Sequence, residues 1–392
     1  MPGGESGGVE QFVLGLVRSL GRLTDGTEEY VVVAHPDAPG WLEPWLGTNQ
    51  RLVAGPPPSG RLRRVLRGTS RRSPLATDGF FESLGVGVAH FPYQSFVDCR
   101  LPTVYNPHDL QHRHYPEFFA AEQLAWRERV HTLALRRATA VAAESHWAAQ
   151  DVVREYAVDP GKIFVVPRGT PTDLYEPPPD ALLAEVRRAF SLPPDFALYP
   201  ARAWPHKNHL RLLEALAVLR DGGLRLDLVC TGKPTGHWAQ VEARARELGL
   251  ESHVHALGFV EPVELRALYR LARLVVVPSL FEGGGFPVLE AFREGTPVAC
   301  SSATALPETA GDAALLFDPE SVEDMAQALG RLAAEEDLRA TLAERGTRRI
   351  SLLDWERTAR AYRALYRNVA GLALSAEDSG ALAGSASQPT AG

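Results

Sequence analysis

The sequence predicts an α/β protein made of two doubly wound domains in tandem, each a parallel sheet with helices on both faces. Strand-like runs alternate with helical patterns in two separate series along the chain. The strand-like runs of the second series are almost continuously apolar, as parallel strands buried on both faces should be. Between the two series, residues 166–179 hold five prolines and a glycine, which indicates an interdomain linker.

The first domain is expected at residues 1–170. Apolar residues recur at helical spacing from Val9 to Leu20 and predict an amphipathic helix. This helix follows Gly7 and Gly8 with no apolar strand in front of them, so the first strand is expected to be missing and the recorded start to lie downstream of the true one. A lost central strand would leave buried backbone groups unpaired, at about 1–3 kcal/mol each. Further strands are predicted at 30–34, 86–91, 140–143 and 163–166.

The second domain is expected at residues 171–353. The helical pattern from Trp355 to Val369 assigns residues 354–372 to a C-terminal helix, and the tail at 373–392, rich in Ser, Ala and Gly, is expected to be disordered. The strands of the second domain are predicted at 196–199, 226–230, 253–256, 274–277 and 298–300.

Composition and charge exclude several classes of protein. A chain of 392 residues with 45% apolar and 23% charged residues is typical of a globular protein with two cores. The net charge of −7 argues against nucleic-acid binding. The three cysteines are too widely spaced for a disulfide framework or a zinc ribbon. Because the sequence shows neither a signal peptide nor an apolar run of 18 residues, a cytoplasmic location is expected.

The segment 278–290 carries the most specific chemistry. Glu282 and Glu290 bracket the glycines 283–285 and a proline at 287, where a helix can begin. Glycines let the backbone approach a ligand, and a helix N-terminus favours an anion. Amides for phosphate together with carboxylates for hydroxyls suit a sugar nucleotide. The alternative is an ordinary strand–loop–helix joint with incidental acids.

Arg202 and Lys207 follow the predicted strand 196–199 and lead into a helical pattern. Two fixed positive charges at such a joint suit a diphosphate, with arginine as a fork and lysine as a point charge. They would also stabilise the negative charge that gathers on a departing nucleoside diphosphate. The alternative is a pair of solvated surface cations.

Together with the segments 295–300 and 306–319, these motifs resemble the donor-binding half of retaining glycosyltransferases of family 4, which have the GT-B fold. The match covers nearly the whole chain. It implies two Rossmann-like domains facing a central cleft, with the helix at 354–372 crossing back to the first domain. It also implies that Arg202 and Lys207 form the family's diphosphate site.

The same resemblance assigns roles to the segment 282–290. Glu282 is implied to contact hydroxyls of the donor sugar and Glu290 the ribose hydroxyls, with the amides of Gly284, Gly285 and Phe286 facing the sugar or phosphate. An acid–base pair as in glycosidases is the competing interpretation. The binding role is favoured because the cations provide for a charged leaving group, which glycosidases lack.

His108 lies in a segment, 106–119, that resembles the His-Asp loop of the acceptor domain, whose histidine lies near the reacting sugar. Gly8 belongs to a pair that resembles the family's Gly-Gly turn, and Gly232 fits its glycine loop in the donor domain. The spacing of His108, His112 and His114 also allows a metal, although no cysteine or carboxylate ligand set lies nearby; His112 and His114 are expected in a solvated loop. With no Asp-x-Asp triplet in the chain, neither a metal nor another cofactor is expected.

Six arginines between residues 61 and 72 form a basic cluster in an acidic protein: Arg61, Arg63, Arg64, Arg67, Arg71 and Arg72. One hypothesis is a peripheral contact with an anionic membrane at its inner face, where each charge would contribute about 1 kcal/mol. The alternative is a disordered, solvated loop. Nucleic acid is not an expected partner.

The resemblance implies transfer of a hexose from a nucleotide sugar to a hydroxyl acceptor with retention, in polysaccharide, glycolipid or glycoconjugate synthesis. GDP-mannose is the favoured donor, because the variants at 108–112 and 204–209 look like those of mannosyltransferases. The alternatives are a sugar-nucleotide epimerase of the same architecture and a non-catalytic nucleotide-sugar-binding protein. A dinucleotide oxidoreductase is disfavoured, because no G-x-G-x-x-G follows a predicted strand.

Overall fold

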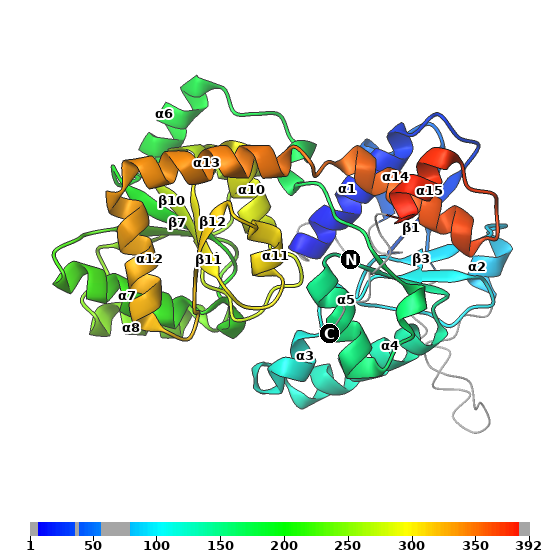
Figure 1. Cartoon of the computed structure of the whole chain (residues 1–392), viewed down its shortest axis with the longest axis horizontal. Coiled ribbons are helices and arrows are strands. Elements are labelled where there is room, and N and C mark those ends of the chain that lie inside the picture. Colours follow the sequence, from blue (N-terminus) through cyan, green and yellow to red (C-terminus); the bar gives the residue numbers. More distant parts are fainter. Residues whose placement is uncertain (1–6, 36–38, 56–78, 384–392) are drawn as a thin grey trace. The chain divides into compact units, whose positions relative to one another are not determined.

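The computed structural model describes residues 7–35, 39–55 and 79–383 of the chain (Figure 1). The chain divides into two compact units, and each is described by itself below. Unit 1 comprises Met1–Gly169 and Asp354–Gly392, and unit 2 comprises Thr170–Leu353. The basic cluster at 61–72 lies outside the described residues.

The strands of unit 1 form two parallel sheets among the described residues. Two strands pair as β1-β2, and four pair in the order β3-β4-β5-β6, so that consecutive strands are neighbours. Parallel neighbours point their carboxyl ends to the same edge of the sheet. The strands are β1 (Tyr30–Ala34), β2 (Gln50–Ala54), β3 (Ala89–Phe91), β4 (Thr103–Tyr105), β5 (Ala140–Ala143) and β6 (Ile163–Val165).

The helices of unit 1 come from both ends of the chain, because α14 packs along α1 and carries α15 on its other side. Helix α1 buries one apolar face, as its spacing predicts, and Asp354 begins α14 by accepting a hydrogen bond from the backbone N–H of Arg357 at 2.7 Å. The helices are α1 (Gly8–Arg22), α2 (Phe80–Ser83), α3 (Gln111–His114), α4 (Ala121–Arg137), α5 (His146–Tyr156), α14 (Trp355–Val369) and α15 (Ala376–Ala383).

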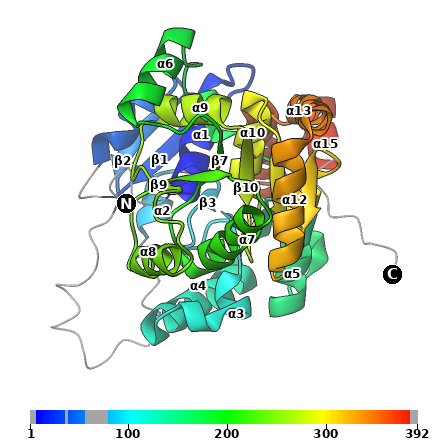
Figure 2. The same cartoon turned by 90° about the vertical axis from the view of Figure 1, so that its left-hand side faces the viewer.

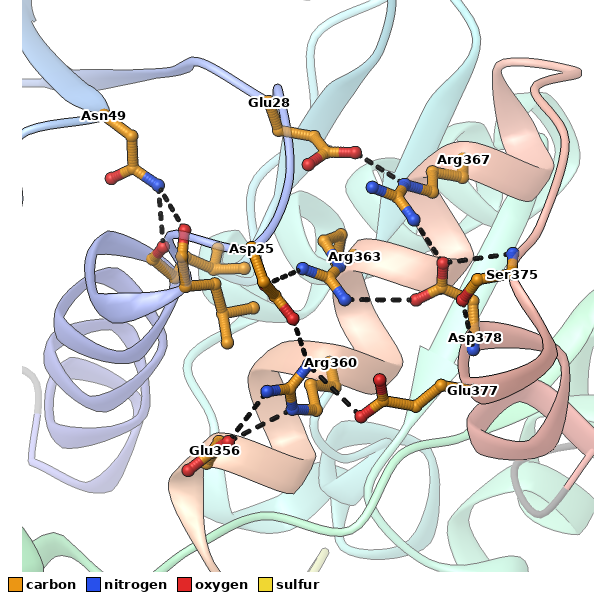
Figure 3. A network of polar contacts seen from close by, with 12 residues as sticks. Asp25, Glu28, Asn49, Glu356, Arg360, Arg363, Arg367, Ser375, Glu377 and Asp378 are labelled. Carbon is orange, nitrogen blue, oxygen red and sulfur yellow. Dashed lines mark hydrogen bonds and ion pairs between the residues drawn. The ribbon is translucent and has the colours of Figure 1, made fainter.

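The expectation of a disordered tail from residue 373 is wrong for α15. Asp378 of α15 is fully buried and is paired with Arg363 and Arg367 of α14 (Figure 3). The same arginines, with Arg360, bind acidic residues of the loop between α1 and β1. Composition did not reveal this helix because its stability comes from charge pairing with α14 and not from an apolar run. Residues 384–392 lie outside the described residues.

Unit 2 contains one six-stranded parallel sheet in the order β12-β11-β10-β7-β8-β9. The chain proceeds outward from β7 through β8 to β9, then returns to place β10 on the other side of β7 and continues outward to β12. The strand order therefore reverses between β7 and β10. The strands are β7 (Phe196–Pro200), β8 (Asp227–Thr231), β9 (Val254–Ala256), β10 (Leu274–Val277), β11 (Val298–Ser301) and β12 (Ala314–Phe317).

Helices cover both faces of this sheet, so the predicted doubly wound arrangement is confirmed for unit 2 (Figure 2). Helices α7, α8 and α12 pack together on one face, and α9, α10 and α13 on the other. The helices are α6 (Asp180–Ala189), α7 (His209–Asp221), α8 (Trp238–Glu247), α9 (Pro262–Leu271), α10 (Phe286–Glu294), α11 (Leu306–Ala310), α12 (Val322–Ala334) and α13 (Glu336–Ile350).

Several strands of the sheets are buried along nearly their whole length, namely β4, β5, β7, β8, β10 and β11. Such strands must end at loops that return to the surface, and those loops carry the polar residues discussed below. Across residues 7–35, 39–55 and 79–383, no helix combines the length and the apolar character needed to cross a bilayer.

Candidate functional site

The candidate donor site of unit 2 lies at the reversal of strand order between β7 and β10. Ligands of doubly wound sheets bind outside the carboxyl ends of the strands at such a point. Lys207 lies in the loop that follows β7, and Glu282 in the loop that follows β10. Two residues 75 positions apart in the sequence are thereby brought to one place.

Lys207 and Glu282 form a direct ion pair, with 2.6 Å between Nζ and Oε1. The hydroxyl of Ser279 donates to the same carboxylate oxygen at 2.7 Å. The hydroxyl of Tyr199 donates to the backbone carbonyl of Lys207 at 2.7 Å and holds that loop against the end of β7. The Lys207 and Glu282 side chains are 17% and 13% exposed, so water and ligands can reach them.

Two strained residues support this pair. Thr304 has φ = 55°, and its hydroxyl accepts from the backbone N–H of Glu282 and donates to the Glu282 carbonyl, both at 3.0 Å. Asn208 has φ = 61°, and its side-chain amide donates to the carbonyls of Pro278 and Pro319 at 3.0 and 2.8 Å. Left-handed backbone at residues other than glycine costs free energy, and it concentrates at functional sites.

Arg202 and Gly232 lie in adjacent loops, after β7 and β8. Gly232 has φ = 117°, and a Cβ there would lie 3.0 Å from the backbone nitrogen of Arg202. Only glycine allows this approach. The Arg202 guanidinium lies 5.3 Å from the ring centre of Trp204, which is 44% exposed. The second cation of the predicted diphosphate site is therefore also at the carboxyl end of the sheet.

The glycine turn forms the N-terminus of α10. Gly285, with φ = 63°, precedes the helix, and Phe286 is its first residue and is buried. The Gly284 carbonyl accepts from the Thr309 hydroxyl at 3.1 Å. A Cβ on Gly285 would lie 2.6 Å from Cδ2 of Leu306, so a side chain there would have to displace Leu306 in addition to adopting the left-handed backbone. The resulting helix N-terminus carries a partial positive charge that favours an anion.

Glu290 lies on α10, one turn into the helix, and is 8% exposed. Its Oε2 accepts from the hydroxyl of Tyr269 at 2.7 Å. Burial and the neighbouring carboxylates of Glu290 and Glu294 hold the pKa of Tyr269 well above its usual value, so Tyr269 is a donor at neutral pH. The second acid of the motif is thus held by a buried phenol.

His108 lies in unit 1, in the loop after β4, with φ = 59°. Its Nδ1 lies 2.5 Å from Oε1 of Glu144, and its Nε2 lies 2.6 Å from the carbonyl of Pro92. The ring also makes an edge contact with Phe12 of α1, at 5.3 Å between ring centres. Gly8 is the first residue of that helix and follows Gly7, whose φ is 58°. The helix that begins at the glycine turn therefore contacts His108 through Phe12.

The expectation that His112 and His114 lie in a solvated loop is wrong. His112 belongs to α3, is 4% exposed and stacks on His131 with 4.9 Å between ring centres. Burial lowers the pKa of His112 to about 4. His114 contacts Asp151 at 2.9 Å. The sequence could not show these contacts, because they come from α4 and α5, which follow later in the chain.

The three histidines of the H-x3-H-x-H spacing have different partners in the structure. Within the described part of the chain, His114, Asp151 and Glu155 bring ligand-type atoms within 4.8 Å of one another. Arg154 already pairs with both acids, and such a pairing competes with a cation. No metal site is assigned to these residues.

Sequence reasoning missed the residues that hold the predicted ones. Ser279 and Thr304 form hydrogen bonds with Glu282. Ser279 belongs to the same 278–290 segment as Glu282. Glu144 and Arg168 lie around His108. The one local signal for Glu144 is its position directly after the buried strand β5, where site residues of parallel sheets occur.

Comparison with known proteins accounts for both units. The family model "Glycosyltransferase Family 4" matches residues 6–174, and the model "Glycosyl transferases group 1" matches residues 185–349. The chain is 32% identical over 228 residues to the D-inositol 3-phosphate glycosyltransferase of Corynebacterium glutamicum, covering 56% of this chain and 54% of that protein. It is 28% identical over 254 residues to the O-antigen chain mannosyltransferase B of Escherichia coli, covering 64% and 66%.

A third relative is the MMP alpha-(1->4)-mannosyltransferase of Mycolicibacterium hassiacum, 32% identical over 224 residues, with 56% of this chain and 51% of that protein covered. The chain thus spans between half and two thirds of the length of these curated relatives.

Solved structures share the fold at lower identity. HepE of Anabaena, solved in complex with UDP and glucose, is 20% identical with a TM-score of 0.74, and the match covers 94% of this chain and 98% of that one. WaaG, a glycosyltransferase involved in lipopolysaccharide biosynthesis, is 18% identical with a TM-score of 0.64, covering 93% and 96%. With both units matched by their family models, and with this fold, the chain belongs to the family 4 glycosyltransferases of the GT-B type.

Proposed function

We propose that the protein is a hexosyltransferase that takes its sugar from a nucleotide-sugar donor and passes it to a hydroxyl acceptor. The observation that carries this proposal is the accessible Lys207–Glu282 pair at the strand reversal of unit 2. A cation for phosphate and a carboxylate for sugar hydroxyls stand side by side there. The names of the relatives, among them two mannosyltransferases and an inositol-phosphate glycosyltransferase, support the same class.

The roles of the unit 2 residues follow from their chemistry. Lys207 exchanges its bond to Glu282 for a bond to the donor diphosphate, and Arg202 adds a second positive charge. Glu282, released from Lys207, accepts hydrogen bonds from hydroxyls of the sugar. These fixed charges stabilise the negative charge that develops on the departing nucleoside diphosphate.

The backbone and the second acid complete the proposed donor site. The amides of Gly284, Gly285 and Phe286 at the N-terminus of α10 face the sugar or phosphate. Glu290 accepts from the ribose hydroxyls, with Tyr269 fixing the direction of its carboxylate. Neither a metal nor another cofactor is required, because the cations and the helix N-terminus supply the positive charge.

GDP-mannose is the proposed donor, and the configuration at the anomeric carbon is retained. The acceptor hydroxyl approaches from the side of the leaving group, and the departing phosphate takes its proton. The choice of mannose is supported by the mannosyltransferase relatives. UDP-glucose is the competing donor, since the similar fold of HepE was solved in complex with it.

Thermal unfolding in the presence of GDP, UDP or ADP tests the nucleotide. GDP is expected to raise the unfolding midpoint most, because GDP-mannose is the proposed donor. A ligand at 100 times its Kd adds about 2.7 kcal/mol to the free energy of unfolding. If only UDP raises the midpoint, the donor is a UDP sugar and not GDP-mannose. If none of the three nucleotides raises it, the proposed function is contradicted. NMR of the product formed from GDP-[¹³C]mannose then separates transfer with retention from inversion and from epimerisation.

A peripheral contact with anionic membrane remains a proposal that depends on the arginines at 61–72. Flotation of the full chain with liposomes that contain or lack phosphatidylglycerol tests it. Equal flotation with both kinds of liposome would end the proposal, whereas selective, salt-sensitive binding to the anionic liposomes would support it.

A further inference from the structure

A cluster of three nearly buried ionisable side chains lies at one edge of the unit 1 sheet. The side chains of His108, Glu144 and Arg168 are 5%, 3% and 8% exposed. Glu144 joins the other two, with Oε1 2.5 Å from Nδ1 of His108 and Oε2 2.7 Å from NH1 of Arg168. Both oxygens of one carboxylate are therefore engaged by separate partners.

The cluster is assembled by four adjacent strands of one sheet. Pro92 follows β3, His108 follows β4, Glu144 follows β5 and Arg168 follows β6. Since these strands are parallel neighbours in the order β3-β4-β5-β6, their carboxyl ends share one edge. That edge is where parallel sheets bind their ligands.

Burying such groups is costly, and a structural role alone does not require it. Each buried ion loses several kcal/mol of solvation, and well-packed apolar residues would stabilise the sheet edge as well or better. His108 adds backbone strain through its φ of 59°. Buried charge and strain at the ligand edge of a sheet together point to a site where geometry matters.

The hydrogen bonds fix the proton positions on the imidazole. A carboxylate only accepts, so Nδ1 of His108 carries the hydrogen that it donates to Glu144. Burial raises the pKa of Glu144, whereas the charges of Arg168 and His108 lower it, and the net shift is downward. Glu144 is therefore ionised at neutral pH. The carbonyl of Pro92, 2.6 Å from Nε2, also only accepts, so Nε2 carries a hydrogen as well and the ring in this arrangement is an imidazolium. Nε2 is the ring atom whose partner a substrate oxygen could replace.

We propose that Glu144 and Arg168 are positioning residues for His108: Glu144 accepts from Nδ1–H and balances the charge of the doubly protonated ring, whose Nε2–H is presented as a donor to an oxygen of the reacting sugar. Arg168 fixes the orientation of the Glu144 carboxylate. This inference rests on the proposed function, since it requires that His108 meets a sugar substrate. Glu144 and Arg168 act through His108 and touch no substrate.

A double-mutant cycle separates positioning from mere bracing of the fold. Glu144→Gln is expected to lower kcat about 10- to 100-fold, by analogy with the loss seen when the hydrogen-bond partner of a metal-ligating histidine is removed. The KM for the donor should change much less than kcat, because the proposed contacts to the nucleotide lie in unit 2. Glu144→Asp, which keeps the charge, should restore part of kcat. In the background of His108→Asn, Glu144→Gln should have almost no further effect on kcat. An equal effect in both backgrounds would overturn the proposal.

Glu294→Gln is the matched control. The Glu294 side chain is fully buried and also joins two cations, Arg266 at 2.7 Å and Arg270 at 2.6 Å, but it lies in unit 2 without contact to His108. This variant should lower the unfolding temperature and leave the coupling with His108→Asn at zero. If Glu144→Gln does not fold, Arg168→Lys serves in the same cycle, with a smaller expected loss of kcat.

A second measurement needs no turnover and so separates this proposal from the proposed function. Nitrogen-15 NMR of the full chain, labelled at histidine, reports which ring nitrogens carry hydrogen. The His108 signals are identified by their loss in His108→Asn. In Glu144→Gln the Nδ1 signal should move, and in Glu294→Gln it should not. If the signal moves but the protein transfers no sugar, the positioning of His108 by Glu144 stands and the proposed function is rejected. If the signal does not move, the positioning role is rejected.

Discussion

The two units place ionisable side chains at the same kind of position and use them differently. In unit 1 the carboxylate of Glu144 is 3% exposed and both of its oxygens are occupied. In unit 2 the Lys207–Glu282 pair is 17% and 13% exposed and joins one oxygen to one cation. A parallel sheet thus supplies either a closed scaffold or an exchangeable pair. The difference lies in the exposure of the side chains and in whether one or both oxygens of the carboxylate are paired with a basic side chain.

Removing the carboxylate at each place gives the largest expected contrast. Glu144→Leu should cost about 3–5 kcal/mol of unfolding free energy, because Arg168 is left buried without its ionised partner. Glu282→Leu should cost only about 1 kcal/mol, because Lys207 keeps its access to water. Urea unfolding of both variants measures the difference. Equal losses would remove the distinction between the closed and the exchangeable cluster.

Lys207→Met tests whether the open pair is there for a ligand. Loss of one preorganised positive group should lower kcat/KM about 10²- to 10³-fold and abolish most of the thermal shift caused by the nucleoside diphosphate. The control is Lys162→Met in unit 1, where Lys162 donates to the carbonyl of Leu135 at 2.5 Å near the end of α4. That variant should lower the unfolding temperature while the increment caused by the nucleotide stays intact. An undiminished nucleotide shift in Lys207→Met would show that the pair is structural.

The two ends of α10 offer a finer test of the unit 2 site. Gly285 and Gly295 both have positive φ, 63° and 74°, so alanine costs roughly 1–2 kcal/mol of backbone strain at each. Only at Gly285 would the new Cβ also meet Leu306, at 2.6 Å; at Gly295 it meets open space. Gly285→Ala should therefore be the less stable variant and should also weaken nucleotide binding. Equal stability of the two variants would mean that Leu306 makes room for the new methyl group at no cost, and that the close packing at Gly285 is not needed by the site.

Acidification should weaken unit 1 more than unit 2. Burial lowers the pKa of His90 and His112 in unit 1 to about 4, and that of His209 in unit 2 to about 3. Unfolded histidine takes up its proton near pH 6.5, so the free energy of unfolding falls as pH drops from 6.5 toward 4. At pH 6 each histidine contributes less than about 1 kcal/mol of this loss. Urea unfolding is measured at pH 7.5 and at pH 6.0 and followed by proteolysis. The released peptides, assigned to unit 1 or unit 2, show which unit loses more stability on acidification. A larger loss in unit 2 would contradict it.

Much of the fold could be predicted where the signal is local. The strands at 30–34, 140–143 and 274–277 have the predicted bounds because their apolar runs end at clear turn signals. Strand β4 was missed, since three residues carry no periodicity and its identity comes from pairing with β3 and β5. Strand β2 was missed for a related reason, because its burial is mixed and, within the part of the chain that the structure describes, it pairs with β1 alone.

The candidate site divides in the same way. Lys207 and Glu282 could be found because each follows an obvious strand and has a glycine or proline within two residues. Their contact depends on the strand order β10-β7, which no local pattern reveals. Glu144 and Arg168 stand in no motif, and only the alignment of four strand ends brings them to His108.

The discontinuous make-up of unit 1 has a consequence for biosynthesis. Its helices α14 and α15 lie beyond residue 353, and α14 packs along α1 while its arginines bind the loop after α1. A ribosome therefore completes all of unit 2 before it makes the segment that α1 needs for burial. Unit 2 is free to fold vectorially, whereas the apolar face of α1 has to wait, which makes the nascent first half the stretch most in need of a chaperone.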